Sequence, residues 1–223
     1  MRFKSIETLV FDFDGTLVDA SAAICQSFNA ALVQLGHESI PDQQIRQLIG
    51  KPLRDMFPAV VPDLDEAGIE ALIDAYRAVF APIACDLSRP MPGLAEMMQH
   101  FHSRVRMGIA TSRMSDGAHQ ILGAMGWLDH FDVIVGLQDV THAKPHPESV
   151  QRVLQTFDTP AERAVMIGDV PADMQAAKAA GTGAIGMISD HHDADVLVAA
   201  GADVTIQSLA ELIDLIDITT PSA

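Results

Sequence analysis

The chain has 223 residues, of which 48% are hydrophobic and 20% are charged, so it can bury a sizeable core and is expected to be folded throughout. Its formal net charge of −16 argues against a surface that binds nucleic acid or membrane, because such binding depends on clustered Lys and Arg. No stretch has the roughly 18 consecutive apolar residues of a transmembrane helix, and we therefore predict a cytoplasmic protein.

Strand-like runs alternate with helical stretches through most of the chain. The first run covers residues 8–13, and later runs cover residues 105–110, 132–135, 164–167 and 183–188. A helix is expected from Pro147, and another over residues 172–180, where Gly181 suits the end of a helix. Strands that alternate with helices predict an α/β fold with a mostly parallel, Rossmann-like sheet.

The interval between the first strand-like run and the run at residue 105 is roughly three times as long as a simple βαβ crossover. Helices are expected there over residues 21–35, 41–49 and 65–80. A stretch with the prolines and glycine of a return linker follows at residues 88–94. We therefore predict a core domain formed by residues 1–15 and 90–223, with an inserted α-helical cap domain over residues 16–89.

Two carboxylates, Asp12 and Asp14, stand at the end of the first strand-like run. If the strand keeps its pleat, both side chains point to one side, at the carboxyl edge where open α/β sheets bind ligands. Such a pair can bind a hard cation, or can divide the roles of nucleophile and general acid/base. The alternative for this segment alone is an Asp-Gly turn with solvated carboxylates.

Polar residues also follow three other strand-like runs: Thr111 and Ser112 in GIATSR, Lys144 in AKPHPE, and Asp169 and Asp173 in MIGDVPAD. Each has a structural alternative, such as a helix cap, a solvated loop lysine or an acidic first turn of a helix. The ordered set, however, resembles the four motifs of the haloacid dehalogenase (HAD) superfamily, whose members are mostly Mg²⁺-dependent phosphatases. The segments DFDGTLVD, PMPGL, KPHPE and GDVPADMQAAKAAG are most similar to the phosphoglycolate phosphatase-like branch, which has a small helical cap.

The resemblance implies a HAD-like core and a role for each motif residue. Asp12 would be the nucleophile that forms an aspartyl phosphate, and Asp14 would be the acid/base. Mg²⁺ would be held by Asp12, the backbone carbonyl of Asp14 and Asp169, while Lys144 would add a fixed positive charge. Asp173 would either belong to the metal shell or orient Lys144. The phosphate would be bound by the Thr111 hydroxyl and by backbone N–H groups of Ser112 and of the turn from Asp12 to Gly15.

The cap is where the resemblance places substrate specificity. Lys51 and Arg54 lie close together in the segment IGKPLRDMF, and we expect one of them to meet a second anionic group of the substrate, such as a carboxylate or another phosphate. Surface solvation of both is the alternative. Arg113 is a further cationic candidate near the mouth of the site.

The expected substrate is a small phosphorylated metabolite. Alternatives are a phosphomutase of the β-phosphoglucomutase type, a pyrophosphatase, and a regulatory HAD-like protein without turnover. Asp14 argues against the dehalogenase branch, which does not need a second aspartate, and against the phosphonate-cleaving branch, which lacks it. The sequence makes no prediction of the oligomeric state. His142, His146 and the pair His191–His192 show no Zn spacing and are interpreted as surface or loop histidines.

Overall fold

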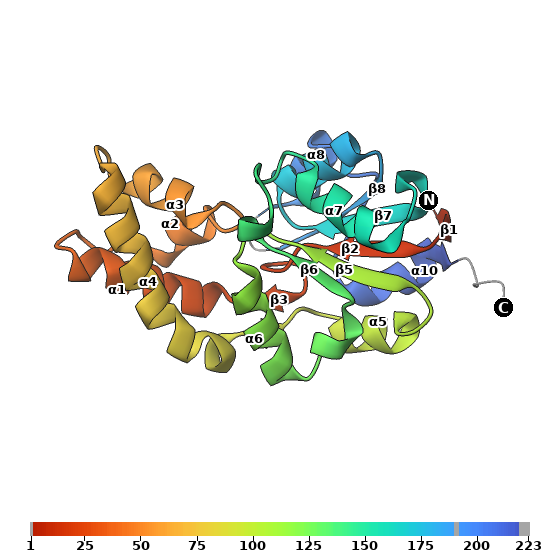
Figure 1. Ribbon diagram of the computed structural model, residues 1–223, viewed down its shortest axis with the longest axis horizontal. Helices are drawn as coiled ribbons and strands as arrows, with labels where there is room; N and C mark the ends of the chain where they lie inside the picture. The colour runs from red at the N-terminus through yellow and green to blue at the C-terminus, as the bar shows by residue number, and fades with distance from the viewer. Residues whose placement is uncertain (1, 190–191, 219–223) are drawn as a thin grey trace.

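The computed structural model describes residues 2–189 and 192–218 and confirms the expected α/β fold (Figure 1). In this part of the chain the main sheet has six parallel strands in the order β6-β5-β2-β7-β8-β9. Their bounds are β2 (Thr8–Phe11), β5 (Arg106–Ala110), β6 (Val133–Val135), β7 (Ala164–Gly168), β8 (Gly183–Met187) and β9 (Val204–Ile206). The first strand-like run was expected to continue to residue 13, so β2 is shorter than predicted.

Helices cover both faces of this sheet. Side chains of β2 alternate between two cores, because successive residues of a strand point to opposite faces: Leu9 and Phe11 belong to one hydrophobic cluster and Val10 to the other. The first cluster includes side chains of α5 (Leu94–Phe101), α6 (Ser115–Met125) and α10 (Leu212–Leu215). The second is closed by α7 (Glu148–Phe157), α8 (Pro171–Ala180) and α9 (Ala194–Ala199). Two further strands, β1 (Phe3–Ile6) and β10 (Ile216–Ile218), pair in parallel with each other.

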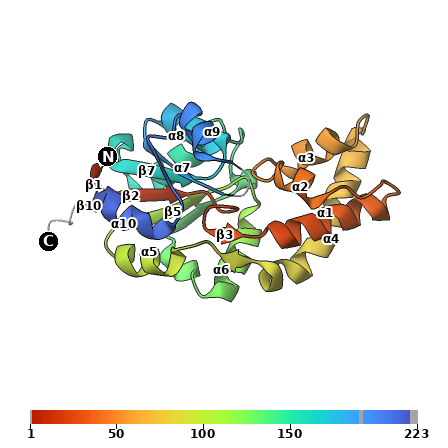
Figure 2. The same ribbon diagram turned by 180° about the vertical axis from the view of Figure 1, so that it is seen from behind.

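A group of helices, which we call the cap helices, lies at one end of the molecule (Figures 1 and 2). It consists of α1 (Ser21–Gln34), α2 (Asp42–Arg46), α3 (Leu53–Val60) and α4 (Glu66–Leu87). The rings of Phe28 and Phe57 stack at 4.3 Å and join α1 to α3. The short antiparallel strands β3 (Val18–Asp19) and β4 (Arg89–Pro90) lie where the chain enters and leaves this group. We propose that they mark the boundary of the cap domain expected at residues 16–89.

The cap helices differ from the predicted ones in their lengths. Helix α2 ends earlier than expected, and α3 is not among the helices expected over residues 21–35, 41–49 and 65–80. Helix α4 continues past residue 80 and through Pro82, since the fully buried Ala84 keeps its last turns packed. No helix in residues 2–189 and 192–218 is long and apolar enough to cross a membrane.

Candidate active site

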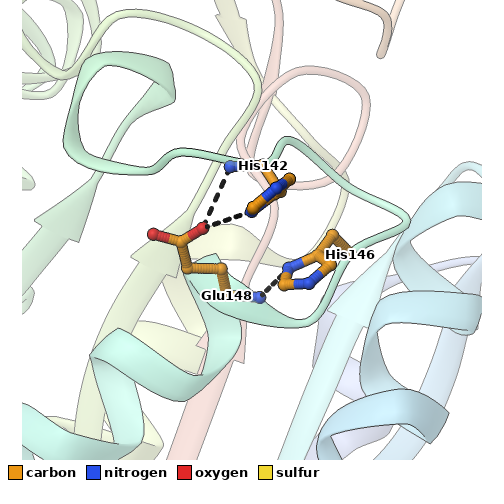
Figure 3. A group of neighbouring side chains, drawn as sticks. All are labelled: His142, His146 and Glu148. Carbon is orange, nitrogen blue, oxygen red and sulfur yellow. Dashed lines mark hydrogen bonds and ion pairs between the residues drawn. The ribbon is translucent and has the colours of Figure 1, made fainter.

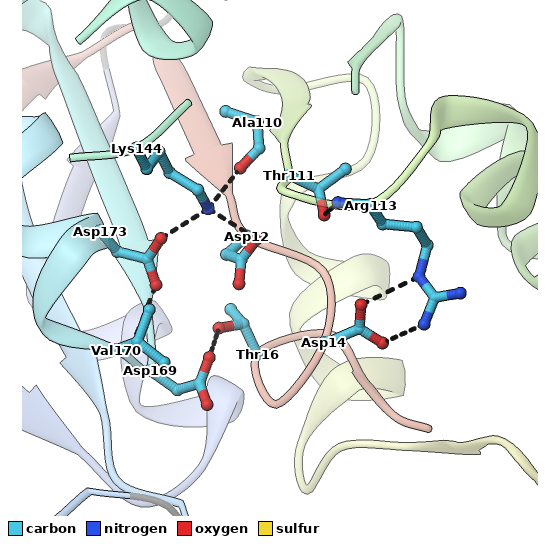
Figure 4. Close-up of polar contacts among 10 residues, drawn as sticks. All are labelled: Asp12, Asp14, Thr16, Ala110, Thr111, Arg113, Lys144, Asp169, Val170 and Asp173. Carbon is cyan, nitrogen blue, oxygen red and sulfur yellow. Dashed lines mark hydrogen bonds and ion pairs between the residues drawn. The ribbon is translucent and has the colours of Figure 1, made fainter. Parts of the chain in front are cut away.

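The motif segments meet because they follow neighbouring strands of the sheet. Strand β2 lies between β5 and β7, so Asp12, Thr111 and Asp169 all stand just beyond the carboxyl ends of three adjacent strands. Lys144 comes from the loop that precedes α7, and Asp173 comes from the first turn of α8. Residues up to 161 positions apart in the sequence therefore share one edge of the sheet (Figure 4).

The ammonium group of Lys144 is the centre of this cluster. Its Nζ donates to Asp12 Oδ1 at 2.8 Å, to Asp173 Oδ1 at 2.6 Å and to the carbonyl of Ala110 at 2.9 Å, which uses all three donors of a lysine. The Lys144 side chain is 2% exposed and those of Asp12 and Asp173 are 3% and 0% exposed. Burial opposes the charged amine, but the carboxylates of Asp12 and Asp173 outweigh it and raise the pKa of Lys144. Lys144 is therefore a permanent positive charge beside Asp12.

Three buried carboxylates form one cluster here, and two of them, Asp12 and Asp173, bind Lys144. Oxygen atoms of Asp12, Asp169 and Asp173 lie within 4.8 Å of one another. Burial raises the pKa of Asp12 to about 7, although Lys144 acts in the opposite direction. The pKa of Asp169 is raised well above its usual range, mainly by burial and to a smaller extent by the negative charges of Asp12 and Asp173. One ammonium group leaves this cluster short of positive charge, and clustered carboxylate oxygens are what a hard divalent cation binds.

The position of Asp169 also fits a metal ligand. Thr16 Oγ1 donates to Asp169 Oδ1 at 3.1 Å, and Ser189 Oγ donates to Oδ2 at 3.2 Å, so both oxygens are oriented. Gly15 has a φ of +83°, and a Cβ built on it would lie 2.1 Å from Asp169 Oδ2. Only glycine lets the backbone of this turn approach the carboxylate so closely. The residues present therefore fit a divalent cation between Asp12 and Asp169.

Asp14 has a different partner from Asp12. Strand β2 ends at Phe11, so the pleat that would bring both carboxylates to one side is interrupted, and the two side chains diverge (Figure 4). Arg113 donates two hydrogen bonds to Asp14, from Nε to Oδ2 at 2.9 Å and from Nη2 to Oδ1 at 2.6 Å. The guanidinium also lies over the Phe80 ring of α4, 4.7 Å from its centroid. Burial opposes the charge of Arg113, but Asp14 outweighs it and raises the pKa of Arg113.

Sequence reasoning placed Arg113 near the mouth of the site and missed this ion pair. The pair connects the expected acid/base, through Arg113, to a helix of the cap. A carboxylate that accepts both arms of a guanidinium fork is bound in its ionised form. The side chain of Asp14 is directed toward Arg113 in this arrangement, and its proposed contact with a metal is through the backbone carbonyl.

Backbone and hydroxyl donors face the same edge. Thr111 is buried, and its Oγ1 accepts from the backbone N–H of Arg113 at 3.1 Å, which leaves the hydroxyl proton available. Among the described residues, no acceptor is found for the backbone N–H groups of Phe13, Asp14 and Ser112. These are the donors expected to bind phosphate oxygens. Gly15 was expected to contribute too, but its N–H donates to the carbonyl of Val18 at 2.8 Å and is not available.

A cavity of about 530 Å³ lies between this edge and the cap helices. Asp12, Asp14, Thr111, Ser112 and Arg113 line it from the core side, and Lys51, Arg54, Tyr76, Arg77 and Phe80 are among the cap residues that line it. Arg54 forms ion pairs with Glu66 and Glu70, whereas Lys51 has no salt bridge within residues 2–189 and 192–218. Lys51 is therefore the cap cation most available to a ligand.

The chain matches the family model for haloacid dehalogenase-like hydrolases over residues 9–187, a span that contains every residue of the cluster. The chain belongs to this family. The protein named Probable phosphatase IndB, from Dickeya dadantii, is 32% identical over 212 residues, which are 92% of this chain and 91% of that protein. Pyrophosphatase PpaX from Anoxybacillus flavithermus is 27% identical over 217 residues, covering 97% of this chain and 99% of that protein. The crystal structure of a haloacid dehalogenase-like hydrolase from Bacteroides fragilis superposes with a TM-score of 0.89, at 28% identity, over 93% of this chain and 100% of that one.

Two contacts of this haloacid dehalogenase-like site were not anticipated from the sequence. Thr16 directly follows the DFDG segment, and Ser189 lies just beyond the carboxyl end of β8, so both belong to the same sheet edge as the motif residues. A hydroxyl residue in the loop that follows a strand is the signal that was available for each. Both act on Asp169, the residue for which the sequence offered no orienting partner.

Proposed function

We propose that the protein is a Mg²⁺-dependent phosphatase that hydrolyses a small phosphorylated metabolite through an aspartyl phosphate on Asp12. The observation that carries the proposal is a buried Asp12 that Lys144 holds by one oxygen, at the wall of a cavity and beside two further carboxylates. Family membership and the phosphatase and pyrophosphatase names of similar proteins support it. A cytoplasmic location remains the prediction from composition.

The proposed reaction begins with attack of an Asp12 carboxylate oxygen on phosphorus. Lys144 holds Oδ1, while Oδ2 accepts no hydrogen bond from the described residues. As the new O–P bond forms, the bond between phosphorus and the leaving oxygen breaks, and Asp14 gives its proton to that oxygen. Thr111 and the N–H groups of Phe13, Asp14 and Ser112 would bind the equatorial oxygens. Bound Mg²⁺ would supply positive charge against the phosphoryl group.

The second half of the reaction restores the enzyme. Asp14, now a carboxylate, takes a proton from water, the water oxygen attacks phosphorus, and the bond to Asp12 breaks to release phosphate. The Asp14–Arg113 ion pair suits this half, because it holds Asp14 as a base. For the first half with a poor leaving group, Arg113 has to release Asp14.

A pyrophosphatase is the second candidate, and the same ion pair favours it. Pyrophosphate expels phosphate, a leaving group that needs little protonation, so an Asp14 held as a carboxylate is less of an obstacle. The similarity to a pyrophosphatase, which covers 97% of this chain, supports this candidate as well. A phosphomutase or a regulatory protein without turnover has no comparable support from a contact in the described structure.

For either substrate class, Lys51 is the residue we propose to meet the second anionic group. It lines the same cavity as Asp12 and is unpaired among the described residues, whereas Arg54 already forms ion pairs with two glutamates. We expect Lys51→Ala to raise KM for 2-phosphoglycolate or pyrophosphate by roughly tenfold, with little effect on a phosphate ester that has no second anion. Arg54→Ala is the matched control. Equal effects on both substrate types would contradict this role.

The test of the function is phosphate release from a panel of 2-phosphoglycolate, pyrophosphate and sugar phosphates, with Mg²⁺ or with a chelator. Wild type and Asp12→Asn, which keeps the size of the side chain, are compared at equal concentration. The proposal expects strong turnover of at least one compound, lost with the chelator and with the substitution. If folded wild type released phosphate from none of them, the phosphatase assignment would be wrong.

A further inference from the structure

The loop that carries Lys144 brings together a second group of potential ligands, on the surface. His142, His146 and Glu148 offer ligand atoms that all lie within 4.8 Å of one another (Figure 3). His142 and His146 are exposed, and the two rings lie side by side with their centroids 4.5 Å apart. Glu148 is the first residue of α7. We propose that these three residues form a binding site for a divalent transition-metal ion of the Zn²⁺ type, separate from the carboxylate cluster at Asp12.

The spacing of the donors fits such an ion. His142 Nδ1 lies 3.3 Å from Glu148 Oε2. Two ligands bound to tetrahedral Zn²⁺ at about 2.0–2.1 Å are about 3.3 Å apart, so an ion can take the place of the proton between these two atoms. His146 Nδ1 lies 3.3 Å from the backbone N–H of Glu148 and accepts from it, so its lone pair faces the same residue. On binding of an ion, this lone pair would exchange its long hydrogen bond for a bond to the metal.

The carboxylate of Glu148 is already oriented as a metal ligand would be. Its Oε1 accepts from Arg152 Nη2 at 2.8 Å and from the backbone of Thr141 at 3.0 Å. Its Oε2 accepts from the backbone of His142 at 2.9 Å and is the oxygen that faces the imidazole. Outer contacts that fix a ligand in place are typical of protein metal sites. Together they also lower the pKa of Glu148 to about 2, led by the Thr141 and Arg152 contacts, so the carboxylate is ionised.

The donor types select the class of ion. Two imidazoles and one carboxylate suit Zn²⁺ and its neighbours in the first transition row, whereas Mg²⁺ prefers oxygen ligands. Three protein ligands on an exposed surface leave the remaining position to water. The net charge of −16 favours accumulation of cations near the protein. The two histidines flank Lys144 in the sequence, so an ion bound here would tie both sides of that residue to the first turn of α7.

The sequence alone did not reveal this group because its third ligand comes from the helix after the loop. His142 and His146 were interpreted as surface histidines, and both are indeed exposed. His191 lies outside the described residues. What the fold adds is the return of the chain at residues 141–148, which places the Glu148 carboxylate against the His142 ring.

The test is calorimetric titration of the whole protein with Zn²⁺ in saturating Mg²⁺, which occupies the carboxylate cluster. We expect one equivalent of Zn²⁺ to bind wild type, and His142→Ala and Glu148→Gln to weaken it by at least roughly tenfold. His102→Ala is the matched control, since the ring of His102 also lies beside that of another histidine, His130, with the centroids 4.4 Å apart. It should bind Zn²⁺ as wild type does, and so should Asp169→Asn.

Circular dichroism of each variant tests whether a loss of binding follows from unfolding. His146→Ala, at an exposed position, serves as an additional variant if Glu148→Gln is unstable. The proposal is overturned if wild type binds no Zn²⁺, or if the His142 and His146 variants bind it as tightly as wild type. It is equally overturned if Asp169→Asn, but not His142→Ala, abolishes binding. None of these outcomes depends on phosphatase activity.

Discussion

Removal of divalent metal is expected to destabilise the protein far more at pH 8 than at pH 5. Burial raises the pKa of Asp12 to about 7 in the metal-free fold, against about 3.9 for an ordinary aspartate. Because the folded pKa is above the unfolded one, the metal-free fold binds more protons than the unfolded chain between about pH 4 and pH 7. Its free energy of unfolding therefore falls as the pH rises through this window. Bound Mg²⁺ would compensate the ionised carboxylates and remove that loss.

The magnitude follows from the shift. A fully linked group costs about 1.4 kcal/mol per pH unit within the window, so Asp12 alone contributes on the order of 2 kcal/mol between pH 5 and pH 7. Asp169, whose pKa is also raised, acts in the same direction. For a chain of this size, a free-energy change of that order corresponds to about 4–8 °C in melting temperature.

The assay is thermal unfolding at pH 5, 6, 7 and 8, each with Mg²⁺ and with a chelator. Carboxylates elsewhere in the chain contribute equally to both melting temperatures at one pH, so their contribution cancels in the difference. This difference should grow steadily from pH 5 to pH 8 in wild type, and Asp169→Asn should reduce it at every pH. An equal difference at all pH values, or a larger one at pH 5, would refute the reasoning.

Three further predictions concern single residues of the site. Gly15→Ala should abolish Mg²⁺-dependent phosphate release, because the added Cβ would lie 2.1 Å from the Asp169 carboxylate. The control is Gly36→Ala, which has the same φ of +83° and no atom within 4 Å of the added Cβ. This variant should keep full activity and lose about 1 kcal/mol of stability. Lys144→Met should lower the free energy of unfolding by about 3–5 kcal/mol at pH 8 in denaturant titrations, since it leaves buried carboxylates unpaired, and a loss below 1 kcal/mol would contradict this. In Arg113→Met, the ratio of turnover of an alkyl phosphate to that of p-nitrophenyl phosphate should rise several-fold, because Asp14 is then free to donate its proton to the leaving oxygen. An unchanged ratio would show that the ion pair does not restrain Asp14.

The fold class could be predicted because short apolar runs alternate with helical stretches, which is the pattern of a parallel α/β sheet. Strand ends were harder to place. Phe13 is fully buried although β2 ends at Phe11, so an apolar residue by itself does not show where the ladder stops. Helix α3 lies outside the three cap helices that periodicity predicted. Its Pro52 occupies the N-cap, where it needs no N–H donor, and Pro58 lies inside the helix.

The meeting of Asp12, Lys144 and Asp169 was anticipated from the resemblance of their segments to the motifs of the haloacid dehalogenase superfamily. Asp12 and Asp169 directly follow neighbouring strands, whereas Lys144 lies in the loop before α7, nine residues beyond β6. The pairing of Asp14 with Arg113 could not, because the two residues are 99 positions apart and neither periodicity nor spacing tells which strand-end groups face each other. The same holds for Glu148, whose approach to His142 depends on the path of a loop. Side-chain partners across loops are fixed by packing that the sequence pattern does not encode.

The central claim, that Asp12 carries the phosphoryl group, is tested most directly by trapping it. The Asp14→Asn variant is mixed with p-nitrophenyl phosphate and Mg²⁺. The p-nitrophenolate leaving group needs no proton, so transfer of the phosphoryl group to Asp12 proceeds, whereas hydrolysis of the aspartyl phosphate lacks its general base. The account predicts a burst of one p-nitrophenolate per enzyme and, after acid quench, a mass increase of one phosphoryl group on the peptide that contains Asp12. Neither should occur in the double variant with Asp12→Asn. Turnover by wild type without a phosphorylated peptide in Asp14→Asn, or with the phosphoryl group on another residue, would contradict the account.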